Sequence, residues 1–208
     1  MIKEKLGARL DGLLQAAFPF LFKRAVNPNV LTVVGTVVSV GAAWSFAAGH
    51  FLAGAVVMLL GGFFDLIDGV VARHFDSSTT FGAFLDSTLD RLVDMALMLG
   101  LILHYGAAGD RQGELLAAIV LVSSILTSYA KARAELSIEH LPGGLLERGE
   151  RIGILAAGAL FGVMIPALWV LALGTTATAW QRMAAASREM RSMDAMAYAM
   201  AREAGKSG

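Results

Sequence analysis

Five aspartates lie at helical spacing inside two otherwise apolar stretches of the chain. Asp65 and Asp68 are three residues apart, and Asp86, Asp90 and Asp94 follow one another at intervals of four. Residues at these spacings share one face of a helix. If the two helices pack together, their carboxylates converge and repel one another unless a cation neutralises them. Hard oxygen ligands of this kind select Mg²⁺, Mn²⁺ or Ca²⁺, so the pattern predicts a divalent-metal site.

Salt bridges or an ion path would account for the aspartates less completely than a metal site. Salt bridges inside the membrane would serve two of the five acids through Arg73 and Arg91, and would leave three without a basic partner. A cation or proton path would account for the carboxylates, but not for the glycines and the arginine that accompany them. An acid in a bilayer costs about 2.5–3.5 kcal/mol, which makes a metal site the better interpretation of the cluster.

The composition indicates a polytopic membrane protein. Of 208 residues, 56% are hydrophobic and only 16% are charged, against about 25% charged in soluble domains. This excludes a disordered chain and leaves too little polar surface for an ordinary soluble domain. The net charge is zero, so we expect no nucleic-acid partner. The absence of cysteine excludes disulfides, thiolate nucleophiles and sulfur-ligated zinc.

Apolar stretches of the length that crosses a bilayer predict an all-α integral membrane protein with six transmembrane helices. A single span over 152–180 would break the positive-inside rule, so we predict a hairpin there that turns near Pro166. All basic residues except Arg91 and Arg111 then lie in or beside segments on the cytoplasmic side. The predicted spans are 30–49, 51–72, 83–103, 115–130 and the two arms of 152–180.

The two ends of the chain are expected to lie outside the membrane. Leucines at helical spacing in residues 1–25, among scattered charges, predict an amphipathic helix on the cytoplasmic membrane surface. Residues 26–190 are expected to form the six-helix catalytic domain. Residues 191–208 are expected to be a cytoplasmic tail, formed by a Met-rich helix that continues from the last span.

The stretch from Asp65 to Asp90 resembles the signature of the CDP-alcohol phosphotransferases, also called CDP-alcohol phosphatidyltransferases. Their pattern is D-x2-D-G-x2-A-R-x8-G-x3-D-x3-D, and every fixed position matches. The resemblance implies transfer of a phosphoryl-alcohol group from a CDP-linked lipid to an acceptor hydroxyl, with release of CMP. It also implies six spans, an N-terminal surface helix, a homodimer, and an active site on the cytoplasmic face of the inner membrane.

The same resemblance assigns roles to residues. Asp65 and Asp86 would bridge two Mg²⁺ ions (or Mn²⁺), Asp68 would complete one ion site, and Asp90 the other. Asp90 would also be the catalytic base that takes the proton of the acceptor. The predicted CDP-lipid-binding residues are Asn29, Val30, Leu31, Thr32, Gly69, Arg73, Thr79 and Gly82.

The acceptor is the part that the signature leaves open. Lys131, Arg133, Arg148 and Arg151 resemble the basic loop of bacterial phosphatidylinositol phosphate synthases, which implies inositol phosphate as acceptor and CDP-diacylglycerol as donor. These cations could instead be ordinary positive-inside loop charge. Phosphatidylglycerophosphate synthases usually have proline after the third aspartate, where this chain has Ser87. Glycerol phosphate, the acceptor of another CDP-alcohol phosphotransferase, and an archaeal-type ether-lipid donor stay as alternatives.

A function of another class is a transporter or binding protein for divalent cations, with the aspartates lining its path. Transporters often contain inverted repeats, and no repeat relates residues 30–108 to 112–190. Membrane lipid and a second copy of the chain are the other expected partners. Small residues at Gly35-x3-Ser39 and Gly158-x3-Gly162 would allow close helix contacts.

Overall fold

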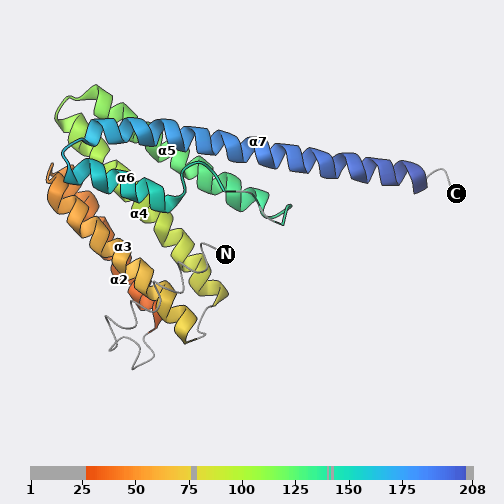
Figure 1. The fold of residues 1–208 in the computed structure, drawn as a ribbon, viewed down its shortest axis with the longest axis horizontal. Coiled ribbons are helices and arrows are strands. Elements are labelled where there is room, and N and C mark those ends of the chain that lie inside the picture. Colours follow the sequence, from red (N-terminus) through yellow and green to blue (C-terminus); the bar gives the residue numbers. More distant parts are fainter. Residues whose placement is uncertain (1–26, 76–78, 140, 142, 205–208) are drawn as a thin grey trace. The chain divides into compact units, whose positions relative to one another are not determined.

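All regular elements in the described part of the protein are helices in the computed structural model, which describes residues 27–75, 79–139, 141 and 143–204. This confirms the predicted all-α class. The N-terminal surface helix expected over 1–25 lies outside the described residues. The helices, labelled as in Figure 1, are α2 (Pro28–Ala47), α3 (Phe51–His74), α4 (Thr80–Ala107), α5 (Arg111–Ala134), α6 (Arg148–Leu160) and α7 (Met164–Ala204).

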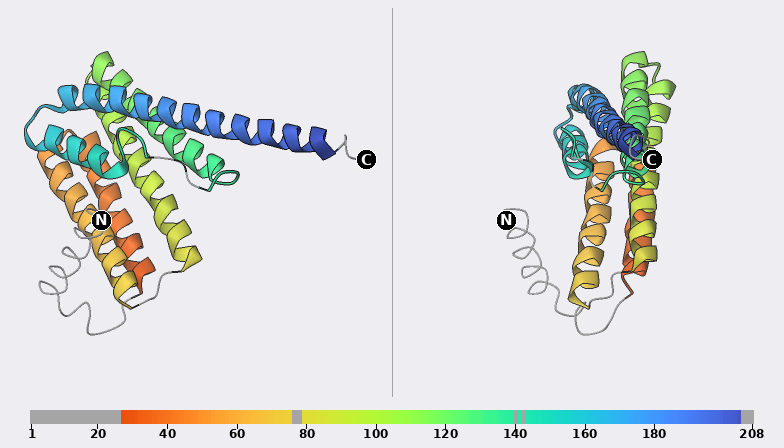
Figure 2. Two further views of the ribbon diagram at one scale, coloured as in Figure 1. Left: turned by 45° about the vertical axis from the view of Figure 1, so that its right-hand side comes forward. Right: turned by 90° about the vertical axis from the view of Figure 1, so that its right-hand side faces the viewer.

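The chain divides into two compact units between His104 and Tyr105. Unit 1 contains α2, α3 and most of α4, and α2 and α3 pack side by side (Figure 2). They are joined by a tight turn in which Gly49 adopts a positive φ of 78°. Gly61 on α3 lies directly against the Ser39 side chain on α2, so the predicted Gly35-x3-Ser39 stripe is used for packing within the unit.

Unit 2 contains α5, α6 and α7, and α7 packs against both of the other helices. A turn separates α6 from α7, with Gly162 at a φ of 68°. The hairpin predicted for 152–180 is therefore present. Its turn precedes Pro166, which lies in the first turn of α7, where a missing N–H breaks no helical hydrogen bond. Gly158 packs against Ala167 across this hairpin.

Three of the described helices are long and apolar enough to cross a membrane by length and composition: α2, α3 and α5. Helix α4 has 28 residues but carries Asp86, Asp90, Arg91 and Asp94. Helix α6 has 13 residues, which extend about 20 Å at the helical rise, less than the roughly 30 Å of a hydrocarbon core. The chain is a membrane protein, and the count of six spans stays a prediction.

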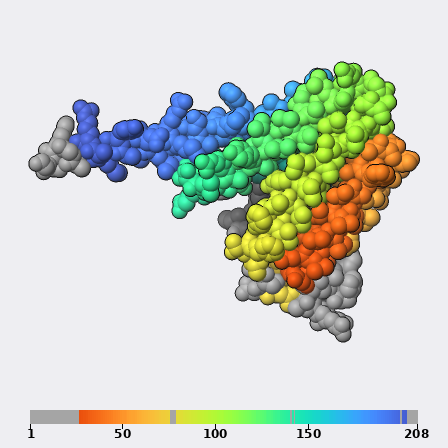
Figure 3. Space-filling model, turned by 180° about the vertical axis from the view of Figure 1, so that it is seen from behind, coloured from red at the N-terminus to blue at the C-terminus, as the bar shows by residue number. Residues whose placement is uncertain are grey.

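Helix α7 continues without a break into the expected tail. It is 41 residues long, and Met190 packs against a buried cluster of Ala134, Ile138 and Leu141. The described side chains beyond Arg191 are exposed, and Figure 3 shows this part of α7 extending past the rest of unit 2. The boundaries 1–25, 26–190 and 191–208 stay predictions, but the predicted last span and the described part of the predicted tail belong to one helix.

Candidate active site

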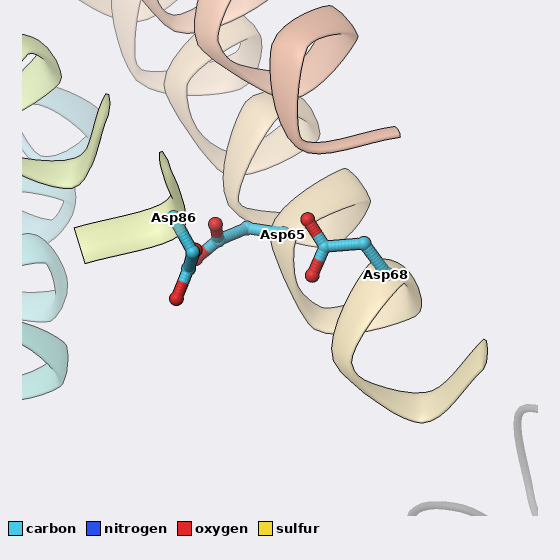
Figure 4. A group of neighbouring side chains, drawn as sticks. All are labelled: Asp65, Asp68 and Asp86. Atoms are coloured by element: carbon cyan, nitrogen blue, oxygen red, sulfur yellow. The ribbon is translucent and has the colours of Figure 1, made fainter. Parts of the chain in front are cut away.

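Three of the predicted metal ligands meet in unit 1. Asp65 and Asp68 are one turn apart near the end of α3, and Asp86 comes from the second turn of α4. Each offers a carboxylate oxygen within 4.8 Å of those of the other two. Figure 4 shows the three carboxylates pointing toward one another. Three converging hard oxygen donors fit a divalent cation such as Mg²⁺ or Mn²⁺.

Asp68 gives the clearest sign that a cation belongs here. The residue is only 6% exposed, and its Oδ2 atom is buried without a hydrogen-bond partner among the described residues. An ionised carboxylate buried in this way is strongly unfavourable unless an opposite charge compensates it. Asp65 and Asp86 are half-buried beside it and add further negative charge. The donor set therefore fits the metal that the sequence predicts.

Asp90 lies outside this group of three in the described chain. It is one turn beyond Asp86 on α4, it is half-buried, and its Oδ2 atom is 3.6 Å from Nη1 of Arg91. Asp94 continues the same stripe by one more turn. The roles of Asp90 as a ligand of the second ion and as the base stay predictions.

A cavity of about 200 Å³ adjoins the aspartates. It is formed by the start of α2, the end of α3 and the start of α4, three segments that are separated in sequence. Six of the eight predicted CDP-lipid-binding residues line it, together with two of the aspartates. Its lining residues are Pro28, Asn29, Thr32, Asp68, Gly69, Ala72, Arg73, Thr79, Gly82, Ala83 and Asp86.

Local capping fixes the walls of this cavity. Asn27 caps α2 by accepting a hydrogen bond from the Asn29 N–H at 3.0 Å, with Pro28 as the first helical residue. Thr79 Oγ1 accepts from the Gly82 N–H at 2.9 Å at the start of α4. A Cβ on Gly82 would lie 3.0 Å from Thr79 Oγ1 and 3.1 Å from Asn29 Oδ1. Glycine at this position keeps open the space between two polar side chains.

Val30 and Leu31 differ from the other predicted CDP-binding residues. Val30 is 54% exposed, and Leu31 packs against the buried cluster of Ile67, Val70 and Val71. Neither is among the described residues that line the cavity. Asn29 and Thr32 are three residues apart and so share a helix face, whereas the two residues between them point elsewhere. Pro28 and Ala83 were not among the predicted site residues, because neither carries a chemical group that marks it in the sequence.

The predicted acceptor residues all lie in unit 2. Lys131 and Arg133 are in the last turn of α5, and Arg148 and Arg151 are in the first turn of α6. Lys131 Nζ is 3.9 Å from Oε1 of Glu135, and Arg133 is exposed. Arg151 is 8% exposed, an unusual burial for a guanidinium. Their joint role in one phosphate pocket stays a prediction.

The start of α6 is suited to an anion. Glu147 is the N-cap residue, and its side chain makes no capping hydrogen bond. The first N–H groups of a helix carry partial positive charge. Arg148 and Arg151 add positive charge there from less exposed side chains, whereas the two acidic residues of the same region, Glu147 and Glu150, are exposed. A phosphate group would be stabilised by the N–H groups and by the two arginines.

Arg182 is a further buried cation of unit 2, and it was not among the predicted site residues. It is 9% exposed, and its Nη1 donates to the Thr127 carbonyl oxygen at 3.0 Å. Thr127 lies one turn before Lys131 on α5. The available signal was position: Arg182 is the first charged residue after the uncharged stretch 152–180.

Comparison with known proteins agrees with this site. The family model for CDP-alcohol phosphatidyltransferases matches residues 25–186. These residues include most of both units and every predicted site residue. The chain belongs to the CDP-alcohol phosphatidyltransferase family. It is therefore an enzyme of the transferase class.

Relatives within the CDP-alcohol phosphatidyltransferase family include phosphatidylinositol phosphate synthases. The one from Mycobacteroides abscessus is 41% identical over 173 residues, which cover 78% of each protein. The crystal structure of the Mycobacterium tuberculosis enzyme with CDP-DAG bound has a TM-score of 0.72 and 33% identity, covering 88% of this chain and 94% of that one. The structure of the same enzyme with manganese and citrate has a TM-score of 0.75 and 34% identity, covering 83% and 88%.

Proposed function

We propose that this enzyme transfers the phosphatidyl group of CDP-diacylglycerol to a hydroxyl of inositol phosphate, with CMP as the other product. The observation that carries the proposal is the cavity of unit 1. It joins Asp68 and Asp86 to Asn29, Thr32, Gly69, Arg73, Thr79 and Gly82 around one space. The choice of substrates is supported by the 41% identity to a phosphatidylinositol phosphate synthase and by the neighbour structure that contains CDP-DAG.

When bound, a divalent metal would neutralise charge on the donor phosphates, and two Mg²⁺ ions, or Mn²⁺, are proposed. Asp65, Asp68 and Asp86 would hold the cations, with Asp90 completing the second site. This is supported by the convergence of the three carboxylates, by the unsatisfied Oδ2 of Asp68 in the described chain, and by the neighbour structure that contains manganese. A carboxylate that binds a cation stays ionised, which Asp90 needs in order to act as a base.

The chain's own groups then have defined tasks. Arg73 lines the cavity, where its guanidinium is assigned to a phosphate of the donor. Asp90 accepts the proton of the acceptor hydroxyl. The hydroxyl oxygen forms a bond to the phosphorus that carries the diacylglycerol, and the bond from that phosphorus to the oxygen of CMP breaks. Asn29, Thr79 and Gly82 are assigned to the nucleotide, because they form the polar wall of the cavity.

The cations of unit 2 are assigned to the phosphate that inositol phosphate already carries. Buried Arg151 and half-buried Arg148 lie at the N-terminal end of α6. Lys131 and Arg133 end α5. Guanidinium groups bind phosphate through paired, charge-assisted hydrogen bonds. An acceptor without a phosphate would make no use of this charge.

A panel of acceptors tests the proposal. Purified protein with CDP-diacylglycerol and Mg²⁺ is offered inositol 1-phosphate, glycerol 3-phosphate, serine or free inositol, and the lipid product is identified by mass spectrometry. We expect phosphatidylinositol phosphate and CMP, formed only with divalent metal. If glycerol 3-phosphate were the one acceptor of the panel that gives a lipid product, glycerol phosphate would be the acceptor instead of inositol phosphate. Absence of CMP release with every acceptor would contradict CDP-diacylglycerol as the donor.

We also propose that the enzyme lies in the inner membrane as a homodimer, with both termini and the loop between α5 and α6 facing the cytoplasm. The chain has no cysteine, so single cysteines at positions 2, 111 and 206 can be labelled with an impermeant reagent on spheroplasts, where the inner membrane is accessible. We expect labelling at 111 only. Labelling at 206 in unpermeabilised cells would contradict the hairpin orientation. Chemical crosslinking of purified protein tests the dimer.

A further inference from the structure

The segment just before α6 is held on α7 by backbone hydrogen bonds to side chains. The Leu145 N–H donates to Oε1 of Gln181 at 3.1 Å. The Leu146 N–H donates to Oγ1 of Thr178 at 2.9 Å. Thr178 and Gln181 are three residues apart, so both lie on one face of α7. Both N–H groups are therefore bonded to side chains of α7.

Close packing reinforces the two hydrogen bonds. Gly144 lies directly against the methyl group of Thr178, and Gly174 lies directly against the side chain of Leu146, so that a Cβ on either glycine would overlap its neighbour. Thr178 is completely buried. Its hydroxyl also donates to the Gly174 carbonyl oxygen at 2.7 Å. We call Gly174, Thr178 and Gln181 the α7 latch.

The latch acts where α6 begins. Leu146 is followed by the N-cap residue Glu147, whose carbonyl oxygen accepts from the Arg151 N–H at 3.2 Å. Arg148 and Arg151 lie in the first turn of α6, two and five residues after Leu146. Because the chain is helical from Arg148 onward, fixing the Leu146 N–H also fixes the origin of both arginines. We expect the start of α6 to shift when the hydrogen bond from the Leu146 N–H to Thr178 is lost.

Helix α7 also contacts the chain before the α5–α6 connection. Arg182 donates from Nη1 to the Thr127 carbonyl oxygen at 3.0 Å, four residues before Lys131 on α5. Farther along α7, Met190 packs against Ala134 and Ile138, which follow Lys131. Helix α7 therefore contacts the chain on both sides of the α5–α6 connection.

We infer that Thr178 is a positioning residue for acceptor binding: through the α7 latch it sets the place of Arg148 and Arg151. This inference rests on the proposed function, which assigns those arginines to the acceptor phosphate. Thr178 itself need not touch the substrate. Its effect is expected on the affinity for the acceptor and not on the donor, whose assigned residues all lie in unit 1.

Two substitutions at one position separate the hydrogen bond from the shape of the side chain. Thr178→Val keeps the shape but removes the acceptor for the Leu146 N–H, whereas Thr178→Ser keeps the hydroxyl. The loss of one net hydrogen bond corresponds to a change of about fivefold to tenfold in a binding constant. We expect Thr178→Val to raise the KM for inositol phosphate by this factor and to change the KM for CDP-diacylglycerol less than about twofold. Thr178→Ser should stay close to wild type.

Thr175→Val is the matched control. Thr175 is on the same helix and is also completely buried. Its hydroxyl is 2.6 Å from Ser123 Oγ on α5, and its described hydrogen bonds go to α5 and α7, none to the segment before α6. Both valine variants should lower the melting temperature, but only Thr178→Val should raise the acceptor KM. An equal change of that KM in both variants, or no change in Thr178→Val, would overturn the inference.

A milder variant covers the case in which Thr178→Val fails to fold. Gln181→Met removes the acceptor for the Leu145 N–H at an exposed position and should raise the same KM about twofold to threefold. Inorganic phosphate, used as a competitor against the acceptor, should show a matching rise of its inhibition constant. Wild-type protein that does not use inositol phosphate would contradict the proposed function. Active wild type with unchanged latch variants would contradict only this inference.

Discussion

The two units handle buried charge in opposite ways. Unit 1 gathers carboxylates: Asp65, Asp68 and Asp86 converge with oxygen atoms within 4.8 Å of one another. Unit 2 buries cations, with Arg151 and Arg182 each less than a tenth exposed. Carboxylates that converge fit a small metal ion, whereas the buried Arg151 at the start of α6 fits an anionic group. Under the proposed function, the donor and its metal belong to unit 1 and the acceptor phosphate to unit 2.

The first prediction tests the chemistry assigned to unit 1 and has the largest expected effect. Asp90→Asn keeps the shape of the side chain but removes the base. Because general-base catalysis contributes about 10²–10⁴-fold, we expect kcat to fall by that factor. The measurement is CMP release at saturating substrates. Asp94→Asn, one turn farther along α4, is the control and should keep most of the activity. Activity above about a tenth of wild type in Asp90→Asn would show that another group is the base.

The second prediction tests whether the carboxylates of unit 1 are assembled for a cation. Asp68→Asn removes the charge of the buried carboxylate whose Oδ2 atom has no hydrogen-bond partner in the described chain. With divalent ions removed by chelation, the variant should be more stable than wild type, because a buried uncompensated charge is lost. With saturating Mn²⁺ the order should reverse, because a ligand that binds only the folded state stabilises it.

Thermal unfolding in detergent measures the stability of wild type and Asp68→Asn, each with divalent ions removed and with saturating Mn²⁺. A difference of about 1 kcal/mol corresponds to about 2–4 °C in melting temperature for a chain of this size. Asp94→Asn is again the control, since Asp94 lies outside the group of three. If the two proteins keep the same order with and without Mn²⁺, the aspartate cluster does not bind the ion.

The third prediction moves to unit 2. Arg151→Ala removes a buried guanidinium from the start of α6. A charge-assisted hydrogen bond is worth about 1.5–3 kcal/mol, so the acceptor KM should rise at least about tenfold. The KM for CDP-diacylglycerol should change little, because the donor is assigned to unit 1. Arg111→Ala, at an exposed arginine that begins α5, is the control. Lower protein yield with both KM values intact would mean that Arg151 serves only membrane orientation.

Sequence alone predicts the site of unit 1 well because its geometry follows from helical periodicity. Asp65 and Asp68 at i and i+3 must share a face, and Gly61 lets α3 approach Ser39 on α2 closely. The capping residues Asn27 and Thr79 can also be recognised from their types and positions. What the sequence motif does not predict is the direction in which each side chain points. Asn29 and Thr32 line the cavity. Val30 and Leu31 lie between them on the helix and point away from it.

Unit 2 shows where such prediction ends. The basic residues are visible in sequence, but the path between α5 and α6 follows no period. It depends on contacts between segments far apart in the chain, such as the Leu146 N–H bonding to Thr178 and the close fit of Gly174 against Leu146. A threonine and a glycine inside an apolar helix resemble ordinary membrane packing residues. Their role becomes apparent only when the partner segment is in view.

The last prediction has the smallest expected effect and tests the donor side of the comparison. Gly82→Ala places a methyl group about 3 Å from Thr79 Oγ1 and Asn29 Oδ1 at the wall of the cavity. The helix itself tolerates alanine, so the protein should fold, while the narrower cavity should raise the KM for CDP-diacylglycerol a few-fold and leave the acceptor KM unchanged. Gly62→Ala on α3, where a Cβ meets nothing within 4 Å, is the control. A change in the acceptor KM instead would break the division of substrates between the two units.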